Sequence, residues 1–230
     1  MKEIKHIFFD LDHTLWDFDK NSELAFLSIF EKNKIRIDLL DFIKAYNPIN
    51  LKYWELYRND QISQADLRFY RLKECFDNLD FKVEAEMINI LAEDYIEALP
   101  VNNHLLDGAK ELLEYLFPKY KLHIITNGFE KVQNIKLENA GIAHYFKTVT
   151  TSEKAGAKKP KPKIFNYALR ESGAKIENSL MIGDNIEADI IGAQKIGMQA
   201  IHFDYYQFQS DIVSAPCTSI RHLSKLYQHL

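Results

Sequence analysis

The sequence predicts an α/β fold: a Rossmann-like parallel sheet forms the core, and an all-helical cap domain is inserted into it. Three stretches support this prediction. Residues 7–9 (Ile-Phe-Phe) form a short apolar run, as in strands that are buried on both faces. From about residue 17 to about residue 99 the apolar positions recur with the period of a helix. Beyond residue 100, apolar strands alternate with helices, which is typical of a parallel sheet with crossover connections.

We therefore expect two domains. Residues 1–16 and 100–230 form the α/β core, and residues 17–99 form the cap between the first strand and the rest of the sheet. Within the cap, Asn47-Pro48 is expected to break the chain, and Ser63 followed by Asp66 gives a capping pattern before a helix.

The cap is rich in aromatic side chains, which suit either the core of a small helical bundle or a surface on which a base stacks. Their helical spacing favours the bundle core. The basic residues Arg58, Arg68 and Arg71 are expected on a solvated face rather than in an anion clamp. The aromatic residues are Phe26, Phe30, Phe42, Tyr46, Trp54, Tyr57, Phe69 and Tyr70.

Composition limits the class of partner. A net charge of -4 argues against a broad nucleic-acid surface and favours a small ligand. The two cysteines, Cys75 and Cys217, support neither a disulfide framework nor a zinc site, and both are expected to be buried. Neither a secretory signal nor a membrane-spanning stretch is evident, so we expect a soluble cytoplasmic protein, a monomer or weak homodimer without nucleic-acid or membrane partners.

In the core, further strands are expected at residues 122–125, 148–151, 180–182 and 199–203, with helices at about 107–116, 130–139, 161–171 and 187–196. Three strands end in polar side chains. These are Asp10 and Asp12, then Thr126 and Asn127, then Asp184 with Asp189 one helical turn later. Parallel strands present their carboxyl ends at one edge of a sheet, so these groups are expected to converge.

Taken alone, Asp10 and Asp12 have two interpretations. They form either a solvated turn that caps a helix or a pair of carboxylates whose repulsion is relieved by a cation or a shared proton. A hard divalent ion takes oxygen ligands, and a carboxylate is a competent nucleophile for phosphorus. The lysine-rich loop 154–163 is also open: it is a solvated charge run, a nucleic-acid patch or, beside carboxylates, the source of a lysine that neutralises phosphate oxygens.

Together these motifs resemble those of the haloacid dehalogenase-like (HAD) hydrolase superfamily, in their usual order and over the whole chain. The matching residues are Asp10-x-Asp12-x-Thr14, Thr126-Asn127-Gly128, Lys159-Pro160 and Gly183-Asp184-x4-Asp189. The helical insertion resembles the cap of the first subclass. The stretch from Ile125 to Leu137, with Lys159-Pro160 and Ile164-Phe165 after it, is similar to the pyrimidine 5'-nucleotidase branch. One departure is His13, where many members have glycine; we expect it to face the cap or solvent.

The resemblance implies a Mg²⁺-dependent phosphomonoester hydrolase that acts through an aspartyl-phosphate. Asp10 would be the nucleophile, and Asp12 would act first as general acid and then as general base. Mg²⁺ would be held by Asp10, the backbone carbonyl of Asp12, and Asp184. Asp189 would be either a water-mediated metal ligand or the partner that orients Lys159.

The phosphate would be bound by Thr14, by Thr126 and by the backbone around Asn127, with Lys159 adding fixed positive charge for catalysis. The favoured substrate is a pyrimidine nucleoside monophosphate, and its specificity would come from the cap. For the base, Trp16, Phe18 and Tyr46 are either contacts or ordinary packing.

Several alternatives share parts of this pattern. They are a phosphatase of phosphoglycolate or a sugar phosphate, a phosphomutase, a haloacid dehalogenase, and a non-catalytic phosphate-binding module. Asp12 and Asp184 count against the dehalogenase, which needs neither a metal nor an acid at the position of Asp12. A binding module is expected to have lost at least one of Asp10, Asp12, Lys159 and Asp184, and the sequence retains all four.

Overall fold

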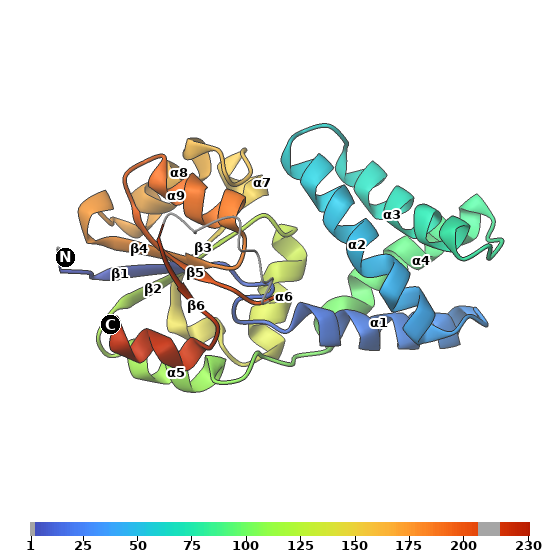
Figure 1. Cartoon of the computed structure of the whole chain (residues 1–230), viewed down its shortest axis with the longest axis horizontal. Helices are drawn as coiled ribbons and strands as arrows, with labels where there is room; N and C mark the ends of the chain where they lie inside the picture. Colours follow the sequence, from blue (N-terminus) through green and yellow to red (C-terminus); the bar gives the residue numbers. More distant parts are fainter. Residues whose placement is uncertain (1–2, 207–216) are drawn as a thin grey trace. The chain divides into compact units, whose positions relative to one another are not determined.

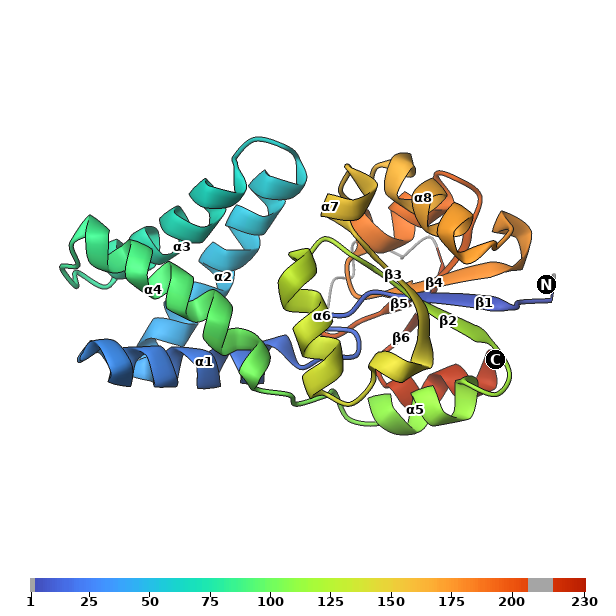
Figure 2. The same cartoon turned by 180° about the vertical axis from the view of Figure 1, so that it is seen from behind.

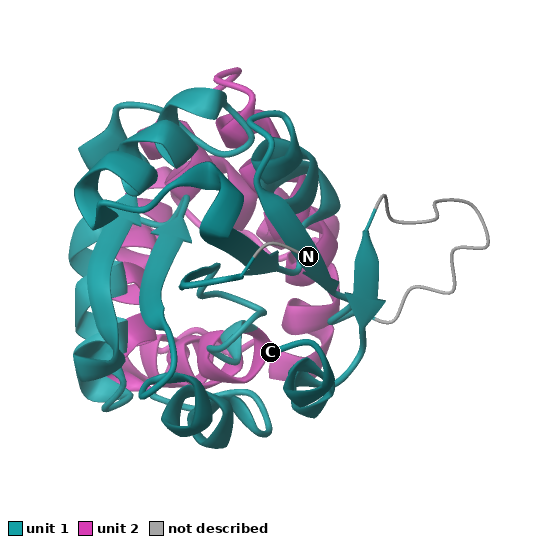
Figure 3. Ribbon diagram, turned by 90° about the vertical axis from the view of Figure 1, so that its left-hand side faces the viewer, with its two compact units in different colours: residues 1–18, 103–230 teal, residues 19–102 magenta. Residues whose placement is uncertain are grey.

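The computed structural model describes residues 3–206 and 217–230, and the chain divides into two compact units (Figure 3). Unit 1 comprises Met1–Phe18 and Asn103–Leu230, and unit 2 comprises Asp19–Asn102. The first boundary expected from the sequence, after residue 16, lies two residues before Phe18, where the first segment of unit 1 ends. The second, after residue 99, lies three residues before Asn102, where unit 2 ends. Every helix among the described residues is too short or too polar to cross a bilayer.

Unit 1 is built on a six-stranded sheet in which the described pairings are all parallel (Figure 1). The strand order is β3-β2-β1-β4-β5-β6, so β1 lies between β2 and β4. The strands are β1 (His6–Phe9), β2 (Lys121–Thr126), β3 (Phe146–Thr151), β4 (Ser179–Gly183), β5 (Gln199–Phe203) and β6 (Thr218–Ile220). The predicted α/β fold with a parallel sheet is confirmed.

Helices pack on both faces of this sheet. Figures 1 and 2 show α8 (Pro162–Ser172) and α9 (Gly192–Gln194) on one face and α5 (Ala109–Leu116) on the other. Phe8, Ile125 and Met181 from three strands pack with Phe165 of α8 in one apolar cluster. Two further helices, α6 (Glu130–Asn139) and α7 (Ser152–Ala155), follow β2 and β3. With both faces covered, the strand ends are where polar side chains of the sheet can meet a ligand.

Two features of unit 1 differ from the prediction. Strand β6 was not predicted, because it has only three residues and two of them are polar. The helix expected at residues 187–196 is instead a π-helical segment, Ile186–Ile191, followed by α9. The Asn185 side chain accepts a hydrogen bond from the Ala188 N–H at 2.8 Å, so a side chain shapes the start of this segment. Segments of π-helix are rare and are often found at functional sites.

The helices of unit 2 are α1 (Phe18–Asn33, whose first residue belongs to unit 1), α2 (Leu39–Arg58), α3 (Gln64–Asn78) and α4 (Ala85–Ala98). The predicted cap at Ser63 is confirmed, since the Asp66 N–H donates to Ser63 Oγ at 3.1 Å. The predicted break at Asn47-Pro48 is wrong, because α2 continues through Pro48. Tyr46 and Ile49 on either side are buried, and their packing holds the helix across a residue that lacks an N–H donor.

Aromatic rings form much of the core of unit 2. The Phe26 ring lies 4.6 Å from that of Tyr46 and 4.5 Å from that of Tyr95, between ring centroids. The bundle-core interpretation is confirmed for the buried residues Phe26, Phe30, Phe42, Tyr46 and Tyr57, whereas Tyr70 is exposed.

Two expectations about burial are wrong. Arg71 does not lie on a solvated face: it is 2% exposed, and its Nη1 donates to Asn50 Oδ1 at 2.9 Å. The reason is helical periodicity, because Leu67 and Leu72 share the buried face of α3 with it. Of the two cysteines, Cys75 is buried as expected, but Cys217 is partly exposed.

Candidate active site

Asp10 follows β1 at the carboxyl edge of the sheet. Its N–H donates to Ile182 O at 2.9 Å, which continues the pairing of β1 with β4 and fixes where the side chain leaves the sheet. The carboxylate is 13% exposed, and its Oδ1 accepts a hydrogen bond from Lys159 Nζ at 2.7 Å. A buried strand and a cation therefore hold Asp10 in place.

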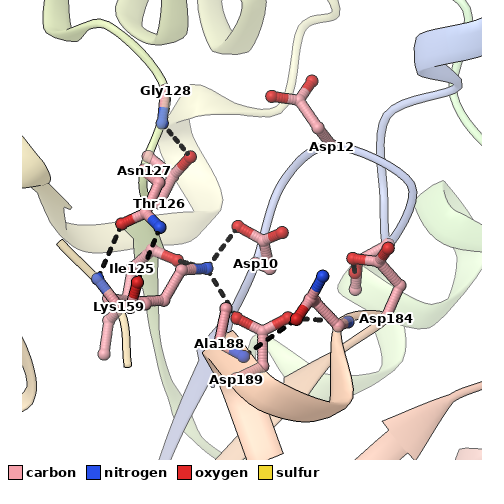
Figure 4. A network of polar contacts seen from close by, with 12 residues as sticks. Asp10, Asp12, Ile125, Thr126, Asn127, Gly128, Lys159, Asp184, Ala188 and Asp189 are labelled. Atoms are coloured by element: carbon pink, nitrogen blue, oxygen red, sulfur yellow. Dashed lines mark hydrogen bonds and ion pairs between the residues drawn. The ribbon is translucent and has the colours of Figure 1, made fainter. Parts of the chain in front are cut away.

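Lys159 lies in the loop between α7 and α8, and its side chain is buried. Its Nζ lies 2.7 Å from Asp10 Oδ1, 2.7 Å from Asp189 Oδ1 and 2.8 Å from Ile125 O. Figure 4 shows the ammonium between the two carboxylates. The ammonium thus donates hydrogen bonds to Asp10 and to Ile125 O and forms an ion pair with Asp189.

The Asn127 side chain fixes the backbone of Lys159. Its Oδ1 accepts from the Lys159 N–H at 2.8 Å, and its Nδ2 donates to Lys159 O at 3.0 Å. The amide of Asn127 is thus engaged with the lysine loop. The phosphate contact expected near Asn127 therefore depends on the backbone there and not on this side chain.

Asp184 and Asp189 follow β4, and Asp189 is fully buried. One Asp189 oxygen is paired with Lys159, and the other accepts from the Asn185 N–H at 3.0 Å. A Cβ at position 183 would overlap the Asp189 carboxylate, so Gly183 makes room for it. Carboxylate oxygens of Asp10, Asp184 and Asp189 lie within 4.8 Å of one another.

The pKa values in this cluster are strongly perturbed. Burial raises the pKa of Asp10 to about 7; Lys159 opposes this shift, and Asp189 and Asp12 add to it. Burial and the charges of Asp10 and Asp189 raise the pKa of Asp184 well above its ordinary value. Burial lowers the pKa of Lys159, but the carboxylates of Asp10 and Asp189 outweigh it and raise that pKa overall. The cluster holds more carboxylate than Lys159 alone neutralises.

This donor set fits a hard divalent cation. The grouped ligand atoms are all carboxylate oxygens, which Mg²⁺ prefers, and their mutual repulsion is what a cation relieves. Both oxygens of Asp189 already have partners, so Asp10 and Asp184 are the side chains better placed to hold an ion.

Thr126, the last residue of β2, has both acceptor positions of its hydroxyl occupied. The Gly128 N–H donates to Thr126 Oγ1 at 3.0 Å, and Gln133 Nε2 donates to it at 2.8 Å. A hydroxyl has one donor and two acceptor positions. The Thr126 proton is therefore left for a third partner, and a phosphate oxygen is a suitable acceptor.

Asp12 is held by two residues to which the sequence analysis assigns no role. Lys136 Nζ donates to Asp12 Oδ1 at 2.6 Å, and Gln133 Nε2 donates to Asp12 Oδ2 at 3.0 Å. The available signal was their place on α6: both are polar, yet they share its buried side with Val132 and Leu137. Polar residues on a buried helix face require partners.

The other candidate residues near β1 have neighbours within unit 1. Thr14 is fully buried, and its Oγ1 donates to Asp184 Oδ1 at 3.4 Å, so this candidate phosphate ligand lies beside a carboxylate. His13 has a φ of 58°, in the left-handed region that favours glycine. Its ring lies 4.9 Å from that of Tyr205 and 5.3 Å from that of Tyr206, an aromatic environment that the sequence analysis does not predict.

For Trp16 and Phe18, and for Tyr46 in unit 2, the sequence allows two roles, contact with a base or ordinary packing. All three side chains are buried. Their burial favours packing.

Comparison with known proteins identifies the family. Residues 7–203 match the family model described as haloacid dehalogenase-like hydrolase. Pyrimidine 5'-nucleotidase YjjG of Escherichia coli is 32% identical over 97% of this chain and 96% of its own length. A glyceraldehyde 3-phosphate phosphatase of Pyrococcus furiosus is also 32% identical, over 90% of this chain and 84% of its own length.

Among solved structures, the HAD-hydrolase YfnB of Bacillus subtilis, bound to magnesium, matches with a TM-score of 0.88 and 28% identity. The match covers 100% of this chain and 99% of that one, so both units have counterparts there. The family model, these relatives and the residues gathered at the strand ends agree, and the chain belongs to the haloacid dehalogenase-like hydrolase family.

Proposed function

We propose that this protein is a Mg²⁺-dependent phosphomonoester hydrolase that acts through an aspartyl-phosphate on Asp10, with a pyrimidine nucleoside 5'-monophosphate as its substrate. The supporting observation is the buried Lys159 between Asp10 and Asp189, at the sheet edge where Asp184 and Thr126 also lie. Asp10 after β1 offers a nucleophile, and Thr126 at the end of the neighbouring strand β2 offers a hydrogen-bond donor for phosphate. Lys159, from the loop between α7 and α8, adds a fixed cation.

In the first step, a carboxylate oxygen of Asp10 attacks phosphorus and the bond to the ester oxygen breaks. Lys159 binds Oδ1 of Asp10, which leaves Oδ2 as the attacking atom. The leaving alkoxide takes a proton from Asp12. Thr126 donates its free proton to a phosphate oxygen, and Asp189 keeps Lys159 in place.

In the second step, water attacks the phosphorus of the aspartyl-phosphate. Asp12, now a carboxylate, takes a proton from that water as general base, and the bond between phosphorus and Asp10 breaks. Inorganic phosphate leaves, Asp10 is again a carboxylate and Asp12 is again protonated. Splitting the hydrolysis in this way replaces one difficult displacement with two easier ones.

Asp10, Asp184 and the backbone carbonyl of Asp12 are the groups that we propose to hold Mg²⁺. The bound ion would supply positive charge against the phosphate and the charge that builds up in the transition state. Asp189 is assigned to the orientation of Lys159, since its two oxygens contact Lys159 and the Asn185 N–H.

The relatives support two substrate classes. A pyrimidine nucleotide is favoured because the pyrimidine 5'-nucleotidase of Escherichia coli covers nearly the whole chain, and a second one, PynA of Streptococcus pneumoniae, is 28% identical over 92% of it. A small sugar phosphate is the second candidate, because a glyceraldehyde 3-phosphate phosphatase has the same identity over 90% of the chain.

The test is phosphate release from a panel of phosphoesters, with Mg²⁺ and after chelation. The panel contains pyrimidine and purine nucleoside monophosphates, glyceraldehyde 3-phosphate, other sugar phosphates and phosphoglycolate. We expect the pyrimidine monophosphates to give the highest kcat/KM and chelation to abolish turnover.

Activity confined to sugar phosphates or phosphoglycolate would retain the mechanism and replace the substrate class. Activity that persists without a divalent ion would contradict the metal assignment. No phosphate release from any member would contradict the hydrolase.

A further inference from the structure

We infer that Gln133 and Lys136 are positioning residues that fix the Asp12 carboxylate for acid–base chemistry; this rests on the function proposed above. The two side chains reach Asp12 from α6, one turn apart on the same face. Each binds a different carboxylate oxygen, Lys136 at 2.6 Å and Gln133 at 3.0 Å. With both oxygens held, the carboxylate has one orientation, and a lone pair on each oxygen remains for substrate or water.

Lys136 is a buried lysine. Its side chain is 2% exposed, and its Nζ lies 4.0 Å from the centroid of the Trp16 ring and 5.4 Å from that of Phe18. Aromatic faces attract a cation and exclude water from it. Exposed ion pairs contribute little to holding a geometry, whereas a pair with one buried member is screened much less. Lys136 therefore restrains Asp12 more firmly than an exposed lysine would.

Gln133 couples Asp12 to the phosphate-binding hydroxyl. Its Nε2 donates both to Asp12 Oδ2 at 3.0 Å and to Thr126 Oγ1 at 2.8 Å. The reverse orientation of the amide would place its oxygen against the Asp12 carboxylate, so that carboxylate determines which end faces it. A Cβ at position 128 would lie 2.5 Å from Gln133 Nε2, so the glycine at position 128 makes room for this amide. The amide thus sets the spacing between the proton donor and the phosphate.

This role predicts a dependence on the leaving group. Proton donation matters most when the departing oxygen is a strongly basic alkoxide and least when it is 4-nitrophenolate, which leaves without a proton. The ratio kcat/KM reports the steps up to the aspartyl-phosphate, in which Asp12 is the acid. A positioning residue for Asp12 should therefore affect kcat/KM for alkyl phosphates selectively.

The test compares Lys136→Met and Gln133→Met with the wild type, using 4-nitrophenyl phosphate and the best alkyl phosphate of the panel. Methionine retains most of the length of either side chain and removes the donor. We expect kcat/KM to fall at least about tenfold on the alkyl phosphate and less than about threefold on 4-nitrophenyl phosphate, because acid–base catalysis contributes about 10²–10⁴-fold. Lys131→Met, at an exposed position of the same helix, should leave both unchanged, and Lys136→Arg should restore most of the loss.

A double-mutant cycle with Asp12→Asn tests whether the residues act through Asp12. In the Asp12→Asn background, Lys136→Met should cause less than about a twofold further loss, since coupled residues are not additive. Equal losses on both substrates, or full additivity with Asp12→Asn, would overturn the inference.

Crystal structures of the wild type and of Lys136→Met separate this inference from the proposed function, because they need no activity. We expect one Asp12 conformer in the wild type and a displaced or multiple one in the variant. An unmoved Asp12 in the variant would overturn the inference even if the wild type hydrolyses phosphoesters. A displaced Asp12 in a protein that is inert toward every phosphoester would support the positioning role and contradict the proposed function alone.

Discussion

Both units bury a basic side chain to the same extent, but with different neighbours. Lys159 in unit 1 and Arg71 in unit 2 are each 2% exposed. Lys159 has two carboxylates at 2.7 Å. Arg71 has the Asn50 amide oxygen at 2.9 Å and the Tyr95 ring centroid at 5.0 Å, and its Nε and Nη2 have no hydrogen-bond partner within the described part of the chain.

This contrast separates a buried charge held by opposite charges from one held by packing. Desolvating either cation is costly, and the cost is offset differently. Lys159 belongs to a network of opposite charges, so deleting it leaves buried carboxylates without compensation. Arg71 is stabilised by ring faces and an amide, so deleting it leaves no charge behind. Substitution by Met should therefore reduce stability much more at Lys159 than at Arg71.

The largest effect expected at the charged network is on turnover. Asp10→Asn removes the proposed nucleophile and should lower kcat on the order of 10⁴-fold or more, with the fold intact because the amide has the same size. Phosphate release and circular dichroism measure the two quantities. Appreciable residual activity in a clean preparation would contradict the assignment of the nucleophile.

Lys159→Met tests the stability of the same network. It should lower the free energy of unfolding by about 3–5 kcal/mol, because Asp10 and Asp189 remain buried without their cation. Urea unfolding measures this change. Lys161→Met, at an exposed position two residues away, is the matched control and should change stability by less than about 0.5 kcal/mol. A loss no larger than that of the control would show that Asp10 and Asp189 do not need the charge of Lys159 for stability.

Unit 1 also buries a pair of histidines, His6 and His123, which unlike Lys159 and Arg71 can become neutral by losing a proton. His6 Nδ1 lies 3.0 Å from His123 Nε2 on neighbouring strands. Burial, with the charges of His6 and Lys121, lowers the pKa of His123 from 6.5 to about 3. The unfolded chain therefore binds more protons between these values, so this contribution to stability is complete above pH 6.5 and is lost as the pH falls toward 3.

The expected slope in that interval is up to about 1.4 kcal/mol per pH unit. Urea unfolding at several pH values measures it for the wild type, for His123→Leu and for His222→Gln, whose side chain is exposed. The leucine variant should show a shallower slope, and the exposed control should match the wild type. Identical slopes in all three proteins would contradict a neutral buried pair.

The smallest effect is expected at Arg71. Arg71→Met keeps most of the volume and removes a buried charge that has no carboxylate partner, so stability should change by less than about 1.5 kcal/mol or should rise. The measurement is urea unfolding alongside Lys159→Met. A loss as large as that of Lys159→Met would remove the distinction between the two sites.

Much of the fold could be predicted because its signals are local. Apolar runs that end in carboxylates predicted β1 and β4, and the Ser63 cap predicted the start of α3. The break predicted at Pro48 was wrong because proline usually ends a helix, whereas here its buried neighbours keep α2 continuous. The solvated position predicted for Arg71 was wrong because its charge suggested exposure, whereas its place on α3 puts it on the buried face.

At the site, the sequence identifies residues at strand ends but not the contacts between side chains. The convergence of Asp10, Asp184 and Asp189 follows from parallel topology and was predicted. The contact of Asn127 with the lysine loop and that of Lys136 with Asp12 were not predicted. Each joins residues more than 30 positions apart in the chain and depends on how their side chains are oriented. No local pattern encodes such pairings.

The central position of β1 has a consequence for folding. His6 pairs with Lys121 on one side and with Ser179 on the other, so the strand that precedes Asp10 has both its neighbours only after β4 has been made. Contacts between such distant residues close large loops and slow folding. Because β1 precedes β2 and β4 in the chain, its apolar residues lack their neighbouring strands until both have been made, and a chain with such exposed residues is prone to aggregate.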